Sequence, residues 1–396
     1  MLPACERFSA SCLPATKASN KPHRACLGGS RAFALQRLFI EKTMTELDIR
    51  AKLGSLVEPE LGLAYDRLGL INTIQITADT IKIDVQLPTP AYPGRERIGD
   101  AICTALYALS TDRKVEVTYS WKVLGKETGG KIGLRIKNVI AVGSGKGGVG
   151  KSTTAASLAY GLKHFGAKVG LLDADVYGPS IPHLTGSKGT PIVKEFELEN
   201  GQKIQRLEPI ESDGMKILSI GFLIRENQAV IWRGPMLHKL LTQFLQETDW
   251  GDLDYLIIDL PPGTGDVSLT LSQLLGLAGA VVVCTPQKVA LLDAIKAISM
   301  FDQVKIPVLG IVENMTGDIF GRGGAKAKAA ELGLPFLGEI PIEATIRVRG
   351  DDGKIASLVE EDNPARPYLL RMTENVAMQI VKRVVLDAPL PTLEIL

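Results

Sequence analysis

A glycine-rich segment near the middle of the chain carries residue types suited to binding a polyphosphate. Gly145-Lys146-Gly147-Gly148-Val149-Gly150-Lys151-Ser152 fits the pattern GxxxxGK[ST] and follows an apolar run at 139–142. Glycines leave main-chain N–H groups open to phosphate oxygens, and a following helix directs its first amides at the anion. Lys151 would neutralise the β- and γ-phosphates, and the Ser152 hydroxyl would ligate Mg²⁺. The predicted ATP-binding residues are Gly145, Lys146, Gly147, Gly148, Val149, Gly150, Lys151, Ser152 and Thr153.

Lys146 adds a second lysine to this loop, five residues before Lys151. One interpretation is a solvated surface charge. The other is a catalytic lysine that reaches the phosphates of a nucleotide bound by a facing subunit. The second interpretation requires a homodimer, because the lysine would then act across the interface between two copies.

Three aspartates lie at or near the ends of two other apolar runs. Asp173 and Asp175 follow the run at 168–172, and Asp259 lies within the run at 255–260. In open α/β sheets the ligand crevice lies outside the carboxyl ends of the strands. We expect Asp259 to hold Mg²⁺ through water and Asp175 to orient the attacking water, since phosphoryl transfer depends mainly on positioning and charge. Asp173 would either help to hold the metal shell or cap a chain end.

The elements that must position these residues form an alternating pattern over 138–396. Short, nearly continuous apolar runs lie at 139–142, 168–172, 255–260, 280–284 and 307–312, as in buried parallel strands, and helical stretches separate most of them. This pattern predicts a doubly wound, mostly parallel α/β sheet of the P-loop NTPase kind. A polar excursion at 186–216 is expected to be a surface hairpin. A core-facing stripe predicts a last helix at about 365–386.

A smaller α+β unit is expected at 44–121, ahead of the ATPase domain. A helix through Ile49 and Val57 would end at Pro59, and strands are expected at 70–77, 80–87 and 115–121 with a helix at 95–109. A Lys/Gly-rich linker would span 122–137. Residues 1–43 are poor in acids, which fits either an over-extended start before Met44 or an organelle transit peptide. The protein would accordingly be cytoplasmic, or imported into an organelle.

Composition excludes several classes of protein. The net charge is +1, but residues 1–43 hold seven basic and two acidic residues, so the remainder is slightly acidic and shows no footprint for nucleic acid. No apolar run is long enough for a transmembrane helix, so no membrane partner is expected. The five cysteines include no CxxC pair, which argues against a disulfide framework and a thiolate zinc site.

Taken together, these motifs resemble the Mrp/ApbC family of iron–sulfur cluster carriers, within the deviant Walker A class that includes MinD. The resemblance extends from Met44 through most of the chain. Beyond the loop it includes 173–180, 232–236, 259–266, 286–287, 291–293 and 313–315. The 44–121 unit resembles the iron–sulfur-assembly domain fused ahead of many bacterial members. The resemblance implies a dimeric ATPase that binds a bridging cluster and hands it to apoproteins, with Asn314 recognising adenine.

The chain departs from this family at the cluster ligands. Family members usually carry a CxxC loop between Asn-Met and Ile-Phe-Gly, whereas this chain has only Thr316-Gly317-Asp318 there. Iron–sulfur clusters need thiolates, and Cys103 and Cys284 are expected to be core residues. Cluster binding by the usual ligands is therefore doubtful. Two alternatives to a carrier are a MinD-like positioning ATPase and a nucleotide-gated scaffold, although the ending at 387–396 has no Lys or Arg to bind a membrane.

Overall fold

A computed structural model describes residues 10–11, 45–109, 113–125, 134–197, 203–223, 234–263 and 265–386. Expectations for most of residues 1–43, for Trp232 and Arg233, and for 387–396 lie outside these ranges. The chain divides into two compact units. A small unit runs to Leu87 and includes Gly94–Trp121, and a larger unit consists of Pro88–Pro93 and the chain from Lys122 onward.

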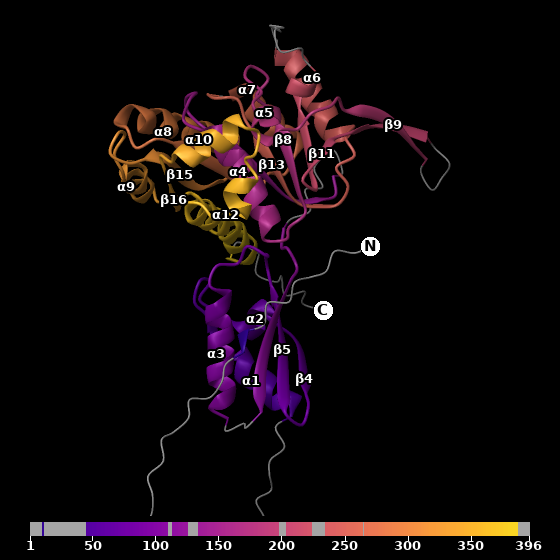
Figure 1. Cartoon of the computed structure of the whole chain (residues 1–396), viewed down its shortest axis with the longest axis vertical. Coiled ribbons are helices and arrows are strands. Elements are labelled where there is room, and N and C mark those ends of the chain that lie inside the picture. The colour runs from indigo at the N-terminus through magenta and orange to yellow at the C-terminus, as the bar shows by residue number, and fades with distance from the viewer. Residues whose placement is uncertain are drawn as a thin grey trace, which may run out of the picture. The chain divides into compact units, whose positions relative to one another are not determined.

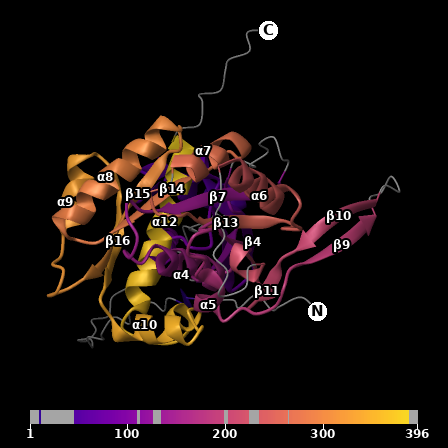
Figure 2. The same ribbon diagram turned by 90° about the horizontal axis from the view of Figure 1, so that it is seen from above.

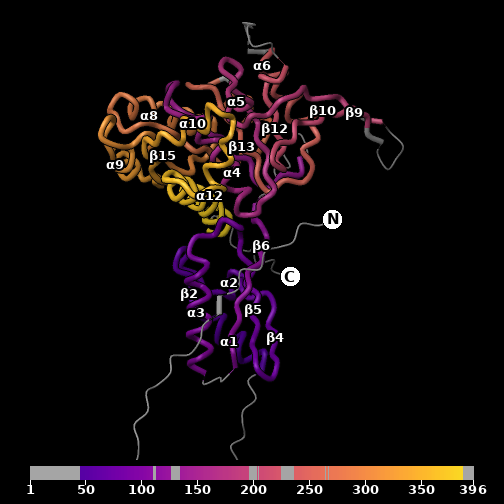
Figure 3. The backbone as a smooth tube through the Cα atoms, in the orientation of Figure 1, coloured from indigo at the N-terminus to yellow at the C-terminus, as the bar shows by residue number. Residues whose placement is uncertain are grey.

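The small unit packs helices on a mixed sheet. Its elements are β1 (Ala10–Ser11), α1 (Glu46–Gly54), β2 (Val57–Glu58), β3 (Leu63–Ala64), α2 (Tyr65–Leu68), β4 (Ile71–Ile76), β5 (Thr80–Leu87), α3 (Arg95–Tyr107) and β6 (Lys114–Trp121). The main sheet has the order β1-β6-β5-β4, with β6 parallel and β4 antiparallel to β5. Every second residue of β5 is buried, so one face of the sheet is covered. Helices α1 and α3 lie along this sheet (Figure 3).

Helix α1 begins with a reciprocal cap and ends earlier than expected. The Thr45 hydroxyl accepts from the Asp48 N–H, and the Asp48 carboxylate accepts from the Thr45 N–H. The helix ends at Gly54 rather than Pro59. Val57 pairs with Ala64 in a short antiparallel bridge between β2 and β3, so the apolar residue that suggested a further helical turn belongs to a strand.

The segment Pro88–Pro93 groups with the larger unit, although the sequence pattern placed it in the small one. Within the larger unit, Thr89 and Tyr255 share a buried hydrogen bond of 3.0 Å between their hydroxyl oxygens. The expected linker is also partly packed, because Val123 and Leu134 are buried and β7 begins at Ile136.

The larger unit is built on an eight-stranded sheet with the order β11-β12-β8-β13-β7-β14-β15-β16 (Figure 1). All neighbours are parallel except β11 and β12. The strands of this sheet are β7 (Ile136–Gly143), β8 (Val169–Asp173), β11 (Ile210–Ser212), β12 (Met215–Ser219), β13 (Leu253–Asp259), β14 (Gly279–Cys284), β15 (Val308–Thr316) and β16 (Phe336–Pro341). The predicted doubly wound α/β fold is confirmed.

Helices cover both faces of this sheet. They are α4 (Lys151–His164), α5 (Ile181–Thr185), α6 (Gly234–Gln246), α7 (Gly265–Leu274), α8 (Lys288–Gln303), α9 (Gly324–Glu331), α10 (Ala344–Asp351), α11 (Ser357–Glu360) and α12 (Arg366–Leu386), with a 3₁₀ turn at Ile220–Phe222. Buried residues of α4, α11 and α12 form one core with the sheet, and those of α6 to α9 form another on the opposite face. Among the described helices, none is both long and apolar enough to cross a membrane.

The polar excursion at 186–216 contains more than a hairpin. Strands β9 (Ile192–Glu197) and β10 (Lys203–Glu208) form the expected antiparallel hairpin, which projects from the sheet of its own unit (Figure 2). The excursion also holds β11 and the start of β12, and β12 pairs in parallel with β8. Strands β12 and β16 were not predicted.

Candidate nucleotide-binding site

The glycine-rich loop joins β7 to α4 at the carboxyl edge of the sheet. Gly148 and Gly150 have φ angles of +77° and +81°, which side chains rarely adopt. Gly145 is required for space, because a Cβ there would lie 2.0 Å from the main-chain oxygen of Asp293. The Ser144 hydroxyl donates to the Lys146 carbonyl at 2.9 Å and fixes the start of the loop. These constraints explain why the loop has this composition.

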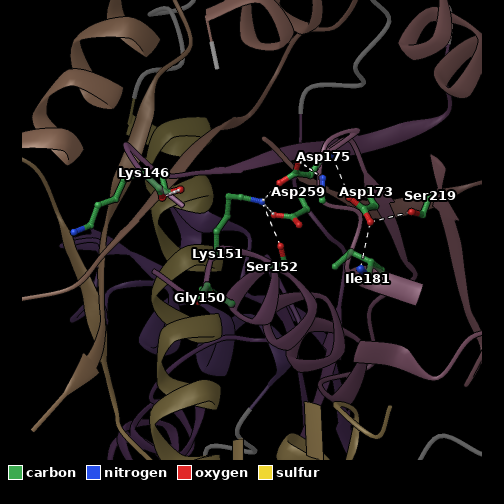
Figure 4. A network of polar contacts seen from close by, with 12 residues as sticks. Lys146, Gly150, Lys151, Ser152, Asp173, Asp175, Ile181, Ser219 and Asp259 are labelled. Atoms are coloured by element: carbon green, nitrogen blue, oxygen red, sulfur yellow. Dashed lines mark hydrogen bonds and ion pairs between the residues drawn. The ribbon is translucent and has the colours of Figure 1, made fainter. Parts of the chain in front are cut away.

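Lys151 lies between two carboxylates at the mouth of the loop (Figure 4). Its Nζ is 2.7 Å from Asp259 Oδ1 and 3.5 Å from Asp175 Oδ2, and all three residues are buried. Nζ also donates to Ser152 Oγ at 3.3 Å. The structure therefore brings together four of the predicted site residues. Lys151 and Ser152 begin α4, Asp259 ends β13, and Asp175 lies in the loop after β8.

Asp259 has an unused oxygen in this cluster. Its Oδ2 is buried and has no hydrogen-bond partner among the described residues. Burial raises the pKa of Asp259 above its ordinary value, while the Lys151 ammonium and the Ser152 hydroxyl lower it. A buried carboxylate oxygen beside a serine hydroxyl is a suitable donor set for Mg²⁺, which prefers oxygen ligands. The residues present thus fit the predicted metal.

Asp173 is fully buried next to this cluster, and protein groups donate hydrogen bonds to its carboxylate. Its carboxylate accepts from the Asp175 and Ile181 N–H groups at 3.1 and 3.2 Å and from the Ser219 hydroxyl at 2.9 Å. Burial and the nearby charge of Asp259 raise the pKa of Asp173 well above its usual range, and the three hydrogen bonds oppose that shift. The contacts fix the segment that carries Asp175. A direct place for Asp173 in a metal shell stays a prediction.

Sequence reasoning missed two supports of the aspartates. Ser219 ends β12, a strand that begins within the polar excursion and was not predicted. The Gly178 N–H donates to Asp175 Oδ1 at 3.1 Å and holds that carboxylate toward Lys151. The motif Asp175-Val176-Tyr177-Gly178 was recognised as a whole, but its spacing does not show which atoms meet.

Asn314 lies beneath the glycine-rich loop. Its Nδ2 donates to the Val149 carbonyl at 2.8 Å, and the side chain is buried. A Cβ on Gly150 would lie 2.1 Å from the same nitrogen. These contacts show a support for the loop. Recognition of adenine by Asn314 stays a prediction.

A cavity of about 300 Å³ opens in front of the loop. Lys146, Gly147, Gly148, Gly150, Lys151, Ser152, Thr153 and Asp175 line it, together with Ser180 and Pro262. Lys146 points away from the Lys151 cluster (Figure 4), and the ion pairs of the described residues at the loop involve Lys151 and not Lys146. The cavity can accommodate an anion at the loop, and Lys146 is available for a contact outside it.

The two cysteines of the described residues are both buried and lie in different units. Cys103 is on α3 of the small unit, and Cys284 ends β14. Cys284 Sγ donates weakly to the Val312 carbonyl at 3.9 Å, and burial followed by the Glu313 charge raises its pKa to about 12. No group of three or more His, Cys, Asp or Glu side chains in the described part of the chain is arranged to hold a metal ion.

The fold and this site define a P-loop NTPase with a second lysine in its loop. Residues 135–377 match the family model of NUBPL iron-transfer P-loop NTPases, and residues 46–119 match that of iron–sulfur cluster assembly proteins. The chain belongs to the family of iron-transfer P-loop NTPases.

Two curated relatives agree with this family, and one solved structure is similar in sequence. The iron–sulfur cluster carrier protein of Deinococcus radiodurans is 41% identical over 87% of this chain and 98% of its own length. The iron–sulfur cluster transfer protein NUBPL of Dictyostelium discoideum is 45% identical over 63% of this chain and 77% of its own. A nucleotide-binding protein from Archaeoglobus fulgidus, solved with ADP, is 40% identical over 59% of this chain and 91% of its own, with a TM-score of 0.48.

Proposed function

We propose that this chain is a homodimeric ATPase that carries iron–sulfur clusters and transfers them to apoproteins. The observation that carries the nucleotide part is the position of Lys151, held between Asp259 and Asp175 at a glycine-rich loop. The cargo follows from the family, whose relatives are named iron–sulfur cluster carrier and transfer proteins. Family membership favours this function over that of a positioning ATPase.

The geometry suggests how ATP would bind. The ammonium of Lys151 is already at the loop, so phosphate oxygens would compete with Asp259 for it. Ser152 and Asp259 would hold Mg²⁺, which supplies positive charge to the phosphate oxygens. Asp175 is fixed by the Gly178 N–H and lines the cavity, so its carboxylate could hold the attacking water in place.

Exposed apolar side chains on and next to the elements that contact the loop, α8 and β15, support the dimer. Val289 and Leu292 in the first turns of α8 are 66% and 61% exposed, and Ile319 is 76% exposed in the turn after β15. Helix α8 contacts the loop directly, because the Asp293 main chain packs on Gly145. Apolar groups around a charged cleft are typical of a surface that a partner covers. A second copy docked here would bring its Lys146 toward the facing nucleotide.

The described cysteines do not supply a bridging site in this proposal. A cluster shared between two copies needs thiolates that face each other, whereas Cys103 and Cys284 are buried in separate units. The carrier would therefore hold its cargo with thiols from elsewhere, such as the tail cysteines or a small-molecule thiol.

The test measures ATP turnover of the full chain with and without iron, sulfide and a thiol. We expect magnesium-dependent ATP hydrolysis that the Lys151→Ala chain lacks, and a change in turnover when the cluster components are added anaerobically. Absence of hydrolysis under all conditions would refute the ATPase. Hydrolysis that never responds to the cluster components, together with no iron transfer to an apoprotein, would refute the carrier.

A further inference from the structure

A second cavity of the larger unit lies at the free edge of its sheet. Its volume is about 570 Å³, and it shares no lining residue with the cavity at the glycine-rich loop. Its walls come from β16, the last strand of the sheet, from the start of α9 and from α12. Helices α9 and α12 pack on opposite faces of the sheet, so the cavity wraps around its edge. We call it the edge cavity, and its charged and aromatic lining residues are Arg322, Lys326, Phe336, Glu339, Tyr368 and Arg371.

The edge cavity is positively charged. Three of its side chains are cations and one is acidic, and Arg322 Nε is 3.5 Å from Glu339 Oε2. The ion pairs of the described residues near the cavity join Arg322 to Glu339 and Lys328 to Glu331, and they include neither Lys326 nor Arg371. The first amides of α9 are already satisfied, because the buried Glu313 carboxylate accepts from the Gly323 and Ala325 N–H groups. An anion would therefore be bound by side chains and not by the helix terminus.

The edge cavity also has aromatic walls. Phe336 and Tyr368 line it from the strand and from α12. Charged side chains alone would be explained by the need to protect a free sheet edge from pairing. Protection of the edge does not require two aromatic rings or a cavity whose volume is in the range of small-molecule sites. Rings of this kind offer flat apolar surface to a planar ligand.

The free edge is closed to a peptide strand. Asn375 Nδ2 on α12 donates to the Leu337 carbonyl of β16 at 2.9 Å. An added strand would have to bond to the main chain of this edge, and Asn375 already occupies that carbonyl. This contact favours a compact ligand over an extended acidic peptide.

We propose that the edge cavity binds a small aromatic anion, a planar ring that carries a phosphate or carboxylate group. Arg371 and Lys326 would bind the anionic group, and Phe336 and Tyr368 would contact the ring. The site is separate from the ATP site, so occupation of one does not require the other.

The test uses phenyl phosphate as the probe and the full chain with excess MgADP to occupy the glycine-rich loop. Binding is followed by isothermal titration and by ligand-observed NMR. We expect saturable binding of one phenyl phosphate per chain, weakened about tenfold or more by Arg371→Glu, because a charge-assisted contact to phosphate is lost. Lys382→Glu, which changes the same charge on the same helix outside the cavity, should alter the affinity less than about twofold.

Two further probes separate the contribution of the anionic group to binding from that of the aromatic ring. Inorganic phosphate and benzyl alcohol should each bind at least about tenfold more weakly than phenyl phosphate. Inorganic phosphate lacks the aromatic ring, and benzyl alcohol lacks the anionic group. Equal binding to wild-type and Arg371→Glu chains of matched melting temperature would overturn the proposal. So would equal binding of inorganic phosphate, or saturable binding of a glutamate-rich peptide with none of phenyl phosphate.

Discussion

The side-chain amide of Asn314 donates a 2.8 Å hydrogen bond to the main-chain carbonyl of Val149. The two residues are 165 positions apart, and they join the end of β15 to the centre of the glycine-rich loop. Gly150 is glycine partly for this reason, because a Cβ would lie 2.1 Å from the same amide nitrogen. The shape of the loop therefore depends on a strand that lies two positions away from β7 in the sheet.

Asn314→Asp should weaken nucleotide binding by about tenfold, because a carboxylate oxygen would then face the Val149 carbonyl and displace the loop. The measurement is a titration with fluorescent ATP and GTP analogues. If Asn314 acts by supporting the loop, affinity for both nucleotides falls together. A loss confined to ATP would instead establish adenine recognition.

Asn375→Asp is the matched control for this substitution. Asn375 also donates its amide to a main-chain carbonyl of the sheet, that of Leu337, but it does so at the outer edge. Nucleotide affinity should stay within about twofold of wild type in this variant. An equal loss in both variants would contradict the special role of Asn314.

Lys151→Ala should reduce ATP hydrolysis by about 100-fold or more, since it removes the cation that faces the phosphates. It should also lower the free energy of unfolding by about 3 kcal/mol, because Asp259 would remain buried without its ion-pair partner. Urea denaturation at several pH values checks the second effect.

The loss of unfolding free energy in Lys151→Ala should depend on pH with a definite sign. Burial already raises the pKa of Asp259, and loss of Lys151 would raise it further. The penalty is present at neutral pH and shrinks as the pH falls toward about 3.9, the pKa of an unfolded aspartate. Lys151→Ala combined with Asp259→Asn should recover stability at neutral pH without recovering hydrolysis. A deficit that is independent of pH would rule out the buried charge as its cause.

The nucleotide loop and most of the sheet could be predicted because their signals are local. Apolar runs gave five strands, and the loop pattern placed Lys151 and Ser152 at the start of α4. Strands β12 and β16 were missed for physical reasons. Strand β16 is at the sheet edge, and its sequence Phe336-Leu337-Gly338-Glu339 mixes polar and glycine residues with its buried positions. Strand β12 follows β11 and begins inside the polar excursion, so its first residues were grouped with that excursion.

The contacts that complete the site could not be predicted in the same way. The bonds of Asp173 to Ser219 and of Asn314 to Val149 join residues 46 and 165 positions apart. Residue type narrows the roles of such side chains, but only the order of the strands decides which of them meet. This explains why Asp173 is open to two interpretations from the sequence. Its carboxylate accepts from the Asp175 and Ile181 amides, and its place in the metal shell stays a prediction.

Lys146→Ala should leave ATP binding intact while it reduces turnover and ATP-dependent dimerisation. The reason is that Lys146 points away from its own Lys151 cluster (Figure 4), and the ion pairs of the described residues at the loop do not include it. Mixing this variant with Lys151→Ala should restore part of the activity, because one site of the heterodimer keeps both lysines. Turnover and sedimentation of the mixture are the measurements, and wild-type behaviour of Lys146→Ala would identify a solvated surface charge.

The last prediction concerns the two buried cysteines. A chain with Cys5, Cys12 and Cys26 replaced by Ser should hydrolyse ATP but hold no stable four-iron cluster, because iron needs thiolates and the pKa of Cys284 is raised to about 12 by burial and Glu313. At pH 8 that thiol is almost wholly protonated, so its alkylation by iodoacetamide should be at least about 100-fold slower than in the urea-unfolded chain. Further substitution of Cys103 and Cys284 to Ser should leave turnover largely unchanged apart from packing losses. Iron per dimer is counted after anaerobic reconstitution and desalting. About four irons per dimer, lost on this double substitution, would contradict the prediction and establish a cluster held by these two residues.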